Sequence, residues 1–212
     1  MIMQASRLVV FLKAPRAGSV KTRLAEALGP EGACAAYRRL VETLLENLAP
    51  LASVELCFSP SDAGTEVKPW LRTGWSMIPQ TSGDLGERIH SAFATHFLTD
   101  AQRVVLIGSD CPELTVRDIE AAWLALEEHD VVLGPARDGG YWLIGLRSPQ
   151  PMLFTGMPWS TDRVFAETKR RAHEHDLRVA VLRELSDVDM ITDWERWLTG
   201  TSLNSPLPHK AT

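Results

Sequence analysis

The sequence has few of the features that mark secreted, membrane or zinc-stapled proteins. Its three cysteines, Cys34, Cys57 and Cys111, are widely spaced and odd in number, which argues against a disulfide framework or a cysteine-rich zinc site and fits a reducing compartment. Long hydrophobic runs are also missing, since the longest early run, Leu8–Leu12, is too short for a signal peptide or a membrane span. We therefore expect a cytoplasmic protein that has no membrane partner.

An excess of basic charge is lacking as well. The chain has 22 Lys and Arg residues against 27 Asp and Glu residues, a net charge of −5, and no basic block stands out. Because duplex nucleic acid is bound through clustered cations that neutralise phosphates, we expect no nucleic-acid partner. The content of 45% hydrophobic and 23% charged residues excludes a disordered or fibrous chain.

The length of 212 residues fits one domain. We expect residues 1–200 to form this domain, and residues 201–212, which contain two prolines and small polar side chains, to be a flexible tail. Nothing in the sequence indicates an oligomeric state.

Short apolar runs that are typical of strands alternate with longer stretches of helical periodicity. Strands are predicted at Leu8–Leu12, Val54–Phe58, Trp75–Pro79, Val104–Ile107, Val131–Leu133, Tyr141–Ile144 and Val179–Leu182. Helices are predicted at about Lys21–Leu28, Gly32–Leu48, Asp84–Leu98, Thr115–Glu128, Thr161–His173 and Thr192–Leu198. This alternation predicts an α/β fold with a mostly parallel sheet flanked by helices, in which ligands bind beyond the carboxyl ends of the strands.

The loop after the first predicted strand is rich in cations. It contains Lys13, Arg16, Lys21 and Arg23 and then enters a helix, whose first backbone N–H groups attract phosphate together with the cationic side chains. It is not a P-loop, because neither required glycine stands before Lys21, and it also lacks the Gly-x-Gly-x-x-Gly pattern of dinucleotide sites. A solvated basic loop is the alternative, and we favour phosphate binding.

Two acidic loops follow later strands. Asp110 comes directly after a buried strand, and Thr115 is better placed to cap the next helix. Asp187 and Asp189 lie on the same side of an extended segment, where two carboxylates repel unless a cation sits between them. Capping of the terminal helix by Asp189 or Thr192 is the alternative. We predict a Mg²⁺ or Mn²⁺ site formed by Asp110 and Asp189, with Asp187 as the third carboxylate.

Three further segments carry residues that suit ligand contacts. The segment Gln80–Arg88 has glycines around a helix start, and Gln80 or Asp84 could hydrogen-bond a base, although Asp84 also fits an ordinary N-cap. The segment Asp138–Tyr141 combines a carboxylate with a flexible turn. In the segment Trp159–Thr161 the ring of Trp159 is able to stack on a sugar.

These segments together resemble a known family, the bacterial DUF2064 transferases, which are described as glycosyltransferases with the GT-A fold of nucleotide-diphospho-sugar transferases. The resemblance covers the chain from the first strand to about Trp197 and departs from the family at Met190-Ile191, where Thr-Pro is frequent. The matching stretches are Phe11–Pro15, Gly18–Leu24, Gly83–Arg88, Gly108–Pro112, Gly134–Tyr141, Pro158–Thr161 and Asp187–Asp189.

The resemblance implies a Rossmann-like GT-A domain with a shared set of site residues. The nucleotide would be bound by Lys13, Ala14, Pro15, Gly18, Lys21 and Arg23, with the base near Gln80, Asp84 and Gly86. The metal would be held by Asp110 and Asp189 with Asp187, and the sugar or acceptor side would be lined by Gly139, Gly140, Tyr141, Trp159, Ser160 and Thr161. Asp138 and Asp110 are the catalytic candidates, with Asp138 as the base.

Three functions are compatible with these residues. The first is a metal-dependent glycosyltransferase that moves a sugar from a nucleotide-diphosphate sugar to a small-molecule acceptor. The second is a guanylyltransferase-like enzyme that moves a nucleoside monophosphate from an NTP to a phosphorylated small acid or sugar, with Arg137 or Arg147 as candidates to hold the acceptor. The third, an inactive nucleotide-binding module, is disfavoured because all three carboxylates of the metal site are present.

Overall fold

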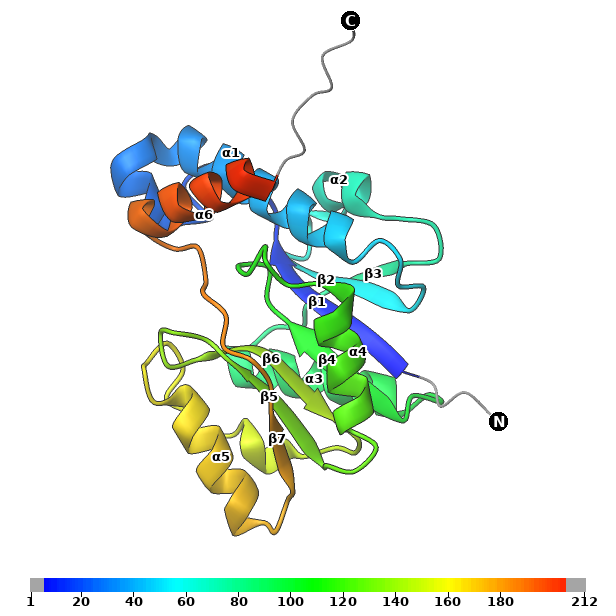
Figure 1. Cartoon of the computed structure of the whole chain (residues 1–212). Helices are drawn as coiled ribbons and strands as arrows, with labels where there is room; N and C mark the ends of the chain where they lie inside the picture. Colours follow the sequence, from blue (N-terminus) through cyan, green and yellow to red (C-terminus); the bar gives the residue numbers. More distant parts are fainter. Residues whose placement is uncertain (1–5, 205–212) are drawn as a thin grey trace, which may run out of the picture.

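The computed structural model describes residues 6–204, which form a seven-stranded sheet with helices on both faces (Figure 1). The strands are β1 (Ser6–Lys13), β2 (Val54–Ser59), β3 (Ser76–Pro79), β4 (Arg103–Ile107), β5 (Val131–Pro135), β6 (Tyr141–Leu146) and β7 (Val179–Val181). The helices are α1 (Thr22–Asn47), α2 (Gly64–Val67), α3 (Leu85–Phe97), α4 (Val116–Ala125), α5 (Val164–Glu174) and α6 (Ile191–Asn204), with 3₁₀ turns η1 (Lys68–Trp70) and η2 (Pro151–Leu153).

The strand order is β3-β2-β1-β4-β6-β5-β7. All neighbouring strands are parallel except β6, which runs antiparallel to both β4 and β5. The central strand β1 is buried along Leu8–Leu12, as expected for a strand that is covered on both faces. The predicted α/β fold with a mostly parallel sheet flanked by helices is confirmed.

Two apolar layers hold the helices against the sheet. On one face, Tyr37 and Leu44 of α1 and Ile119 of α4 pack into one buried cluster with strand residues. On the other face, Phe93 of α3 and Ala172 of α5 belong to a second cluster. Alternate residues of β1 therefore feed both layers, which fixes the position of the loop that follows the strand.

The first long helix is bent where two separate helices were predicted. Helix α1 runs from Thr22 to Asn47 with a break at Gly29, whose φ of 70° and ψ of 167° are non-helical. Glycine adopts this conformation without steric cost, and Pro30 then starts the second part, because the first turn of a helix does not need its missing N–H. The sequence thus indicated both helical parts, and the structure joins them into one bent element.

The C-terminal helix packs along α1 rather than against the sheet, and the two helices lie side by side in Figure 1. Trp197 of α6 contacts Leu40 of α1, and the guanidinium of Arg39 lies 5.3 Å from the centre of the Trp197 ring. Helix α6 continues to Asn204, so the first four residues of the expected tail are helical. Residues 205–212 lie outside the described part of the chain.

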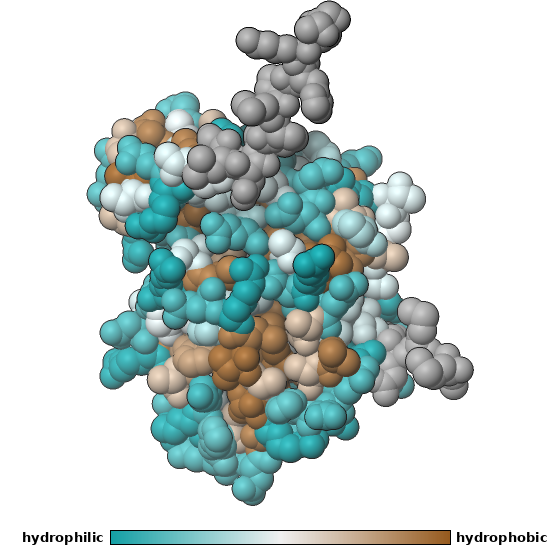
Figure 2. Space-filling model, in the orientation of Figure 1, coloured by the Kyte–Doolittle hydropathy of each residue, from teal (hydrophilic) through white to brown (hydrophobic). Residues whose placement is uncertain are grey.

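The face of the molecule that carries α4 is mostly hydrophilic, and an apolar area lies beside α4 over β5 and β7 (Figure 2). Trp123, Ala180 and Leu182 are partly buried side chains that pack against the core on this side of the sheet. Within residues 6–204, no helix combines the length and apolar character that a membrane crossing requires.

Candidate active site

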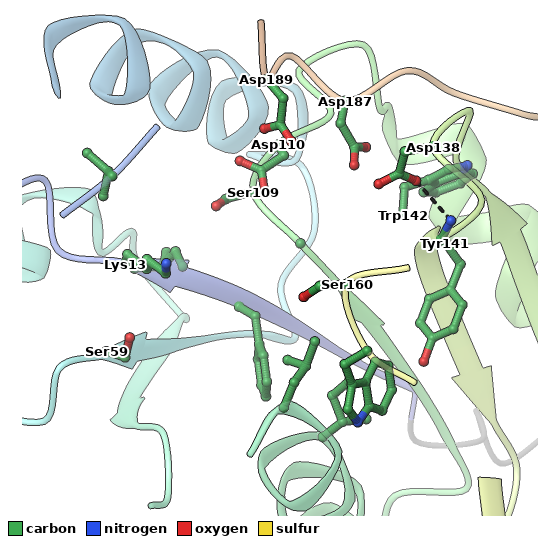
Figure 3. Close-up of a pocket in the computed structure, with 18 of the residues that line it drawn as sticks. Lys13, Ser59, Ser109, Asp110, Asp138, Tyr141, Trp142, Ser160, Asp187 and Asp189 are labelled. Atoms are coloured by element: carbon green, nitrogen blue, oxygen red, sulfur yellow. Dashed lines mark hydrogen bonds between the residues drawn. The ribbon is translucent and has the colours of Figure 1, made fainter. Parts of the chain in front are cut away.

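A pocket of about 550 Å³ opens at the carboxyl ends of the central strands. The chain passes from β1 through β2 to β3 on one side and then returns to β4 on the other, so the crevice between β1 and β4 is the switch point at which α/β sheets bind ligands. Lys13 at the end of β1 and Asp110 after β4 both line the pocket (Figure 3). The pocket therefore lies where the strand alternation predicted it.

Lys21 contacts two of the three predicted metal ligands, Asp110 and Asp189, at once. Its Nζ lies 2.5 Å from Asp110 Oδ1 and 2.8 Å from Asp189 Oδ1, and its side chain is only 4% exposed. Burial alone would lower the pKa of Lys21, but the two carboxylates outweigh it and raise the pKa above its ordinary value. The cation between Asp110 and Asp189 in this conformation is therefore the charged Lys21 side chain.

Asp187 belongs to the same acidic group but has a different partner. The thiol of Cys111 donates a hydrogen bond to Asp187 Oδ1 over 2.8 Å. Burial is the main cause that raises the pKa of Asp187 to about 6, and the charges of Asp110, Asp138 and Asp189 add to it, while the Cys111 hydrogen bond opposes it. These four aspartates lie together on one side of the pocket, and we call them the acidic cluster (Figure 3).

The acidic cluster matches a divalent ion in its chemistry but not in its arrangement. Carboxylate oxygens are the ligands that Mg²⁺ and Mn²⁺ prefer, so the donor chemistry fits. In residues 6–204, however, no three His, Cys, Asp or Glu side chains converge as metal ligands do. Asp110 and Asp189 instead contact Lys21, so the three-carboxylate arrangement predicted from the sequence is not assembled in this conformation.

The four cations of the β1–α1 loop have different surroundings. Arg16 turns away from the pocket and binds Glu66 and Asp62, with nearest N–O distances of 2.6 and 3.2 Å. Lys13, Lys21 and Arg23 line the pocket, and the exposed Arg23 lies 3.8 Å from Asp189. The phosphate-binding potential of this loop therefore rests on three of its four cations.

Lys21 has an unusual backbone conformation at the start of α1. Its φ of 48° and ψ of 47° place it in the left-handed region, which is uncommon for a residue with a side chain. This conformation accompanies a side chain that reaches the β4–α4 and β7–α6 loops, which carry Asp110 and Asp189. Strain of this kind occurs where the surrounding contacts over-determine a residue, as is frequent at functional sites.

Other predicted nucleotide-binding residues of this loop shape it rather than line the pocket. Ala14 is buried and donates its backbone N–H to the carbonyl of Ser59 over 2.7 Å. The carbonyl of Pro15 accepts a hydrogen bond from the Cys34 thiol. Gly18 has a φ of 76°, which favours glycine in the turn. None of Ala14, Pro15 and Gly18 is among the pocket-lining residues.

Of the residues predicted to contact the base, Gln80 lines the pocket and Asp84 does not. Gln80 lines the pocket, but its amide is already engaged: Nε2 donates to the Cys57 carbonyl over 2.9 Å and Oε1 accepts from Arg88 over 3.0 Å. Asp84 caps α3 in a capping box with Glu87 and does not line the pocket, so the capping alternative describes its contacts. Arg88, which the sequence analysis did not single out, is the charged group of this segment in the pocket wall.

Gly86 is required by packing. A Cβ atom at this position would lie 2.6 Å from the Phe154 carbonyl oxygen and 2.9 Å from Trp159 Nε1. Glycine thus lets the first turn of α3 approach the Trp159 segment closely, and Gly86 itself is outside the pocket lining.

The predicted sugar or acceptor residues form a further part of the pocket wall, next to the acidic cluster, to which Asp138 also belongs. Asp138, Gly140, Tyr141, Trp159, Ser160 and Thr161 line the pocket. The backbone N–H of Gly140 donates to Asp138 Oδ1 over 2.9 Å, and the rings of Tyr141 and Trp159 meet edge to face at 6.4 Å. Gly139 supports this turn from outside the lining, because a Cβ atom there would lie 2.1 Å from the carbonyl oxygen of Asp162.

Several pocket residues were missed by the sequence analysis. The hydroxyl of Tyr37, in the middle of α1, accepts from the Lys13 backbone N–H over 2.8 Å and lies 3.2 Å from Ser109 Oγ. Ser59 and Trp142 also line the pocket. Ser109 stood in a motif that was noticed, whereas nothing in the sequence marks Tyr37.

The two arginines considered for the acceptor do not line the pocket. Arg137 lies 3.3 Å from Glu184, and Arg147 lies 3.9 Å from Asp130. A direct contact of either guanidinium with a ligand in this pocket is therefore not supported by the geometry.

Comparisons with known proteins agree with this architecture. The model of the family described as "Uncharacterized protein conserved in bacteria (DUF2064)" matches residues 44–161. A 3-phospho-D-glycerate guanylyltransferase from Phenylobacterium zucineum is 33% identical over 182 residues, which cover 82% of this chain and 72% of that protein.

Solved structures extend the comparison to nearly the whole chain. A protein from Desulfovibrio desulfuricans, assigned as a nucleotide-diphospho-sugar transferase, is 35% identical with a TM-score of 0.88 and covers 98% of this chain and 91% of its own. A CMP:2-keto-3-deoxy-manno-octonic acid synthetase in complex with CTP shares the fold at 11% identity, with a TM-score of 0.59 and coverage of 94% of this chain and 99% of its own. Because the family model matches more than half of the chain, this chain belongs to the DUF2064 family.

Proposed function

We propose that the protein is a nucleotidyltransferase that moves a nucleoside monophosphate from an NTP to a phosphorylated small molecule and releases pyrophosphate. One observation carries the proposal: Lys13, Lys21 and Arg23 line the same pocket as the acidic cluster, at the β1–β4 crevice. The 33% identical guanylyltransferase supports transferase activity and favours nucleotidyl over glycosyl transfer.

The pocket suits the charge that such a reaction must manage. A phosphate oxygen of the acceptor attacks the α-phosphorus, the bond from this phosphorus to the bridging oxygen breaks, and pyrophosphate leaves with the electron pair. Lys13, Lys21 and Arg23 would neutralise the negative charge of the phosphates, which is the main contribution of protein side chains to phosphoryl-type transfer. The Lys21 side chain would have to exchange its contacts with Asp110 and Asp189 for the phosphates.

A general base is unnecessary in this reaction. The second ionisation of a phosphate monoester has a pKa of about 6, so the attacking oxygen is already deprotonated near neutral pH. Asp138, the candidate base for a sugar acceptor, would then only orient the acceptor or its counter-ion. Loss of the Asp138 carboxylate is therefore expected to affect nucleotidyl transfer less than loss of Asp110.

We further propose that Asp110 and Asp189 hold Mg²⁺ or Mn²⁺, with Asp187 nearby, when the nucleotide is bound. The ion would supply charge neutralisation at the phosphates. The support is the donor chemistry of the acidic cluster and the raised pKa of Asp187, which is caused chiefly by burial and further by the charges of Asp110, Asp138 and Asp189. For this role, Asp110 and Asp189 have to be released by Lys21.

The released product tests the proposal directly. The protein is incubated with the four NTPs, with Mg²⁺ or Mn²⁺, and with phosphorylated acceptors such as 3-phosphoglycerate and sugar phosphates. Pyrophosphate release that depends on the acceptor is the expected result. Nucleoside diphosphate released from a nucleotide-diphosphate sugar instead would contradict it, and nucleotide binding without turnover by any donor would favour an inactive module.

Glycosyl transfer is the second candidate, and the acceptor wall favours it. The carboxylate of Asp138 lies beside an aromatic pair, Tyr141 and Trp159, and aromatic rings commonly pack against sugars. The 35% identical structure assigned as a nucleotide-diphospho-sugar transferase is in keeping with this alternative. Under it, replacement of Asp138 by Asn should be among the most damaging changes.

A further inference from the structure

Arg88 is a pocket residue whose side chain is fixed from behind. It lies at the end of the first turn of α3, where its Nε donates to the Asp84 carbonyl over 3.2 Å and its Nη1 donates to Gln80 Oε1 over 3.0 Å. Gln80 is itself held, because its Nε2 donates to the Cys57 carbonyl and its backbone N–H to the Phe58 carbonyl. The guanidinium is thus held in place by two neutral acceptors, one backbone carbonyl and one side-chain amide oxygen.

The unused part of this guanidinium can serve a ligand. Arginine has five N–H groups in a planar fork, and the two hydrogen bonds to Asp84 and Gln80 use one on Nε and one on Nη1. Within residues 6–204, Arg88 forms no ion pair that would neutralise its charge. Three N–H groups therefore remain for a molecule in the pocket.

The surroundings of Arg88 fit a flat, mostly apolar group. Phe11, Leu85 and Ile89 line the pocket together with Arg88, and Phe11 and Ile89 belong to the same buried cluster. Gln80, which binds Arg88, follows β3, whereas Asp110 follows β4, three strand positions away in the sheet. Three strand spacings are about 14 Å, so Arg88 lies far from the acidic cluster, on the side where the nucleoside end of a nucleotide would extend.

We propose that Arg88 recognises the base of the nucleotide by donating two hydrogen bonds to O6 and N7 of guanine, with Gln80 as the residue that positions it. Guanine presents two neighbouring acceptors on this edge, which match the arginine fork, whereas adenine replaces O6 with an amino donor. The proposal rests on nucleotide binding at this pocket, as the proposed function requires, and it adds the identity of the base.

Binding of nucleotide analogues tests this contact without any need for turnover. Affinities are measured by calorimetry for GTP, ITP, ATP and 7-deaza-GTP with Mg²⁺ present. ITP retains O6 and N7, so it should bind about as tightly as GTP. ATP and 7-deaza-GTP each disrupt the paired contact and should bind roughly tenfold or more weakly, as expected for loss of a bidentate contact to a base.

The variant Arg88→Lys makes the test specific. Lysine keeps the positive charge but loses the planar fork, so the variant should bind GTP and 7-deaza-GTP with nearly equal affinity. Gln80→Ala should reduce the same preference, because Arg88 loses one of its two holding contacts. Arg147→Lys, outside the pocket lining, is the matched control and should leave the preference unchanged.

Two results of these affinity measurements would overturn the assignment of Arg88. One is equal binding of GTP and 7-deaza-GTP by the unchanged protein. The other is an Arg88→Lys variant that weakens all NTPs by the same factor, which would identify Arg88 as a phosphate contact. Acceptor-dependent pyrophosphate release without a preference for guanine would overturn the base contact alone, whereas absence of any nucleotide binding would overturn the proposed function together with it.

Discussion

The two sides of the pocket balance their charges in different ways. On the β3 side, Arg88 is held by the neutral acceptors of Gln80 and Asp84, so its position is fixed while its charge is free to act. On the other side lies the acidic cluster, in which Asp110 and Asp189 contact Lys21 while Asp187 receives a hydrogen bond from the thiol of Cys111. The first side therefore presents a fixed hydrogen-bond donor, the Arg88 guanidinium. The second side carries more negative than positive charge, and binding of a further cation would reduce the repulsion there.

The largest effect is expected where the acidic cluster loses a carboxylate that contacts Lys21. Asp110→Asn keeps the shape of the side chain but removes its charge, and acceptor-dependent pyrophosphate release should fall by about 10²–10³-fold, a typical cost of losing one preorganised electrostatic group. Asp189→Asn should act similarly. Initial rates at saturating NTP and Mg²⁺ measure the loss.

A surface carboxylate provides the control for this change. Asp100 forms an exposed ion pair with Arg7, away from the pocket lining, so Asp100→Asn should retain full activity. Full activity of both Asp110→Asn and Asp189→Asn would show that the charges of these two carboxylates are not needed for the reaction. It would contradict the different role given to this side of the pocket.

The sequence was sufficient to predict the sheet, the position of the pocket and most of its charged residues. Those predictions rest on local patterns: β-branched runs for strands, and polar residues in the loops that follow them, at Lys13, Asp110 and Asp187. The break at Gly29-Pro30 was equally local, since both residues act on their own backbone.

The long-range ion pairs of the site could not be predicted from local sequence patterns. The Lys21–Asp189 pair joins residues that are 168 positions apart, and the sequence alone gives no distance between the loops that carry them. The same is true of Arg16, which pairs with Glu66 fifty residues away and leaves the pocket. From the sequence we expected a divalent ion among these carboxylates, whereas in this conformation the packing of the loops places the ammonium of Lys21 between Asp110 and Asp189.

Removal of Lys21 should separate its two contributions. Lys21→Met leaves Asp110 and Asp189 without the ammonium between them, so binding of Mn²⁺ alone should strengthen by roughly tenfold, because a nearby unit charge no longer competes. Pyrophosphate release should fall at the same time, because one phosphate-neutralising cation is gone. Electron paramagnetic resonance of free Mn²⁺ during titration measures the binding without nucleotide.

Arg23 offers the matched comparison for Lys21. It lies at 3.8 Å from Asp189 with a side chain that is 69% exposed, so Arg23→Met should change Mn²⁺ binding much less. Unchanged or weaker Mn²⁺ binding by Lys21→Met would mean that Asp110 and Asp189 do not form a cation-binding site. The second side of the pocket would then not differ from the first in its need for a cation.

The smallest effect is expected in the framework under the acidic cluster, at the pair of Arg183 with Asp118. Burial alone would raise the pKa of Asp118, but the hydrogen bonds from Arg183 and then Thr115 hold it below its ordinary value. The stabilisation from a lowered carboxyl pKa is present above the unfolded value of about 3.9 and disappears as the pH falls through the folded value. Arg183→Gln should therefore lower the free energy of unfolding by about 1 kcal/mol at pH 7, a modest loss because the Arg183 side chain is half exposed. Near pH 2 the loss should be much smaller. Urea unfolding at both pH values measures the difference. An equal loss of stability at both pH values would show instead that Arg183 stabilises the β7–α6 segment through packing. In either case pyrophosphate release should change little, because Arg183 does not line the pocket.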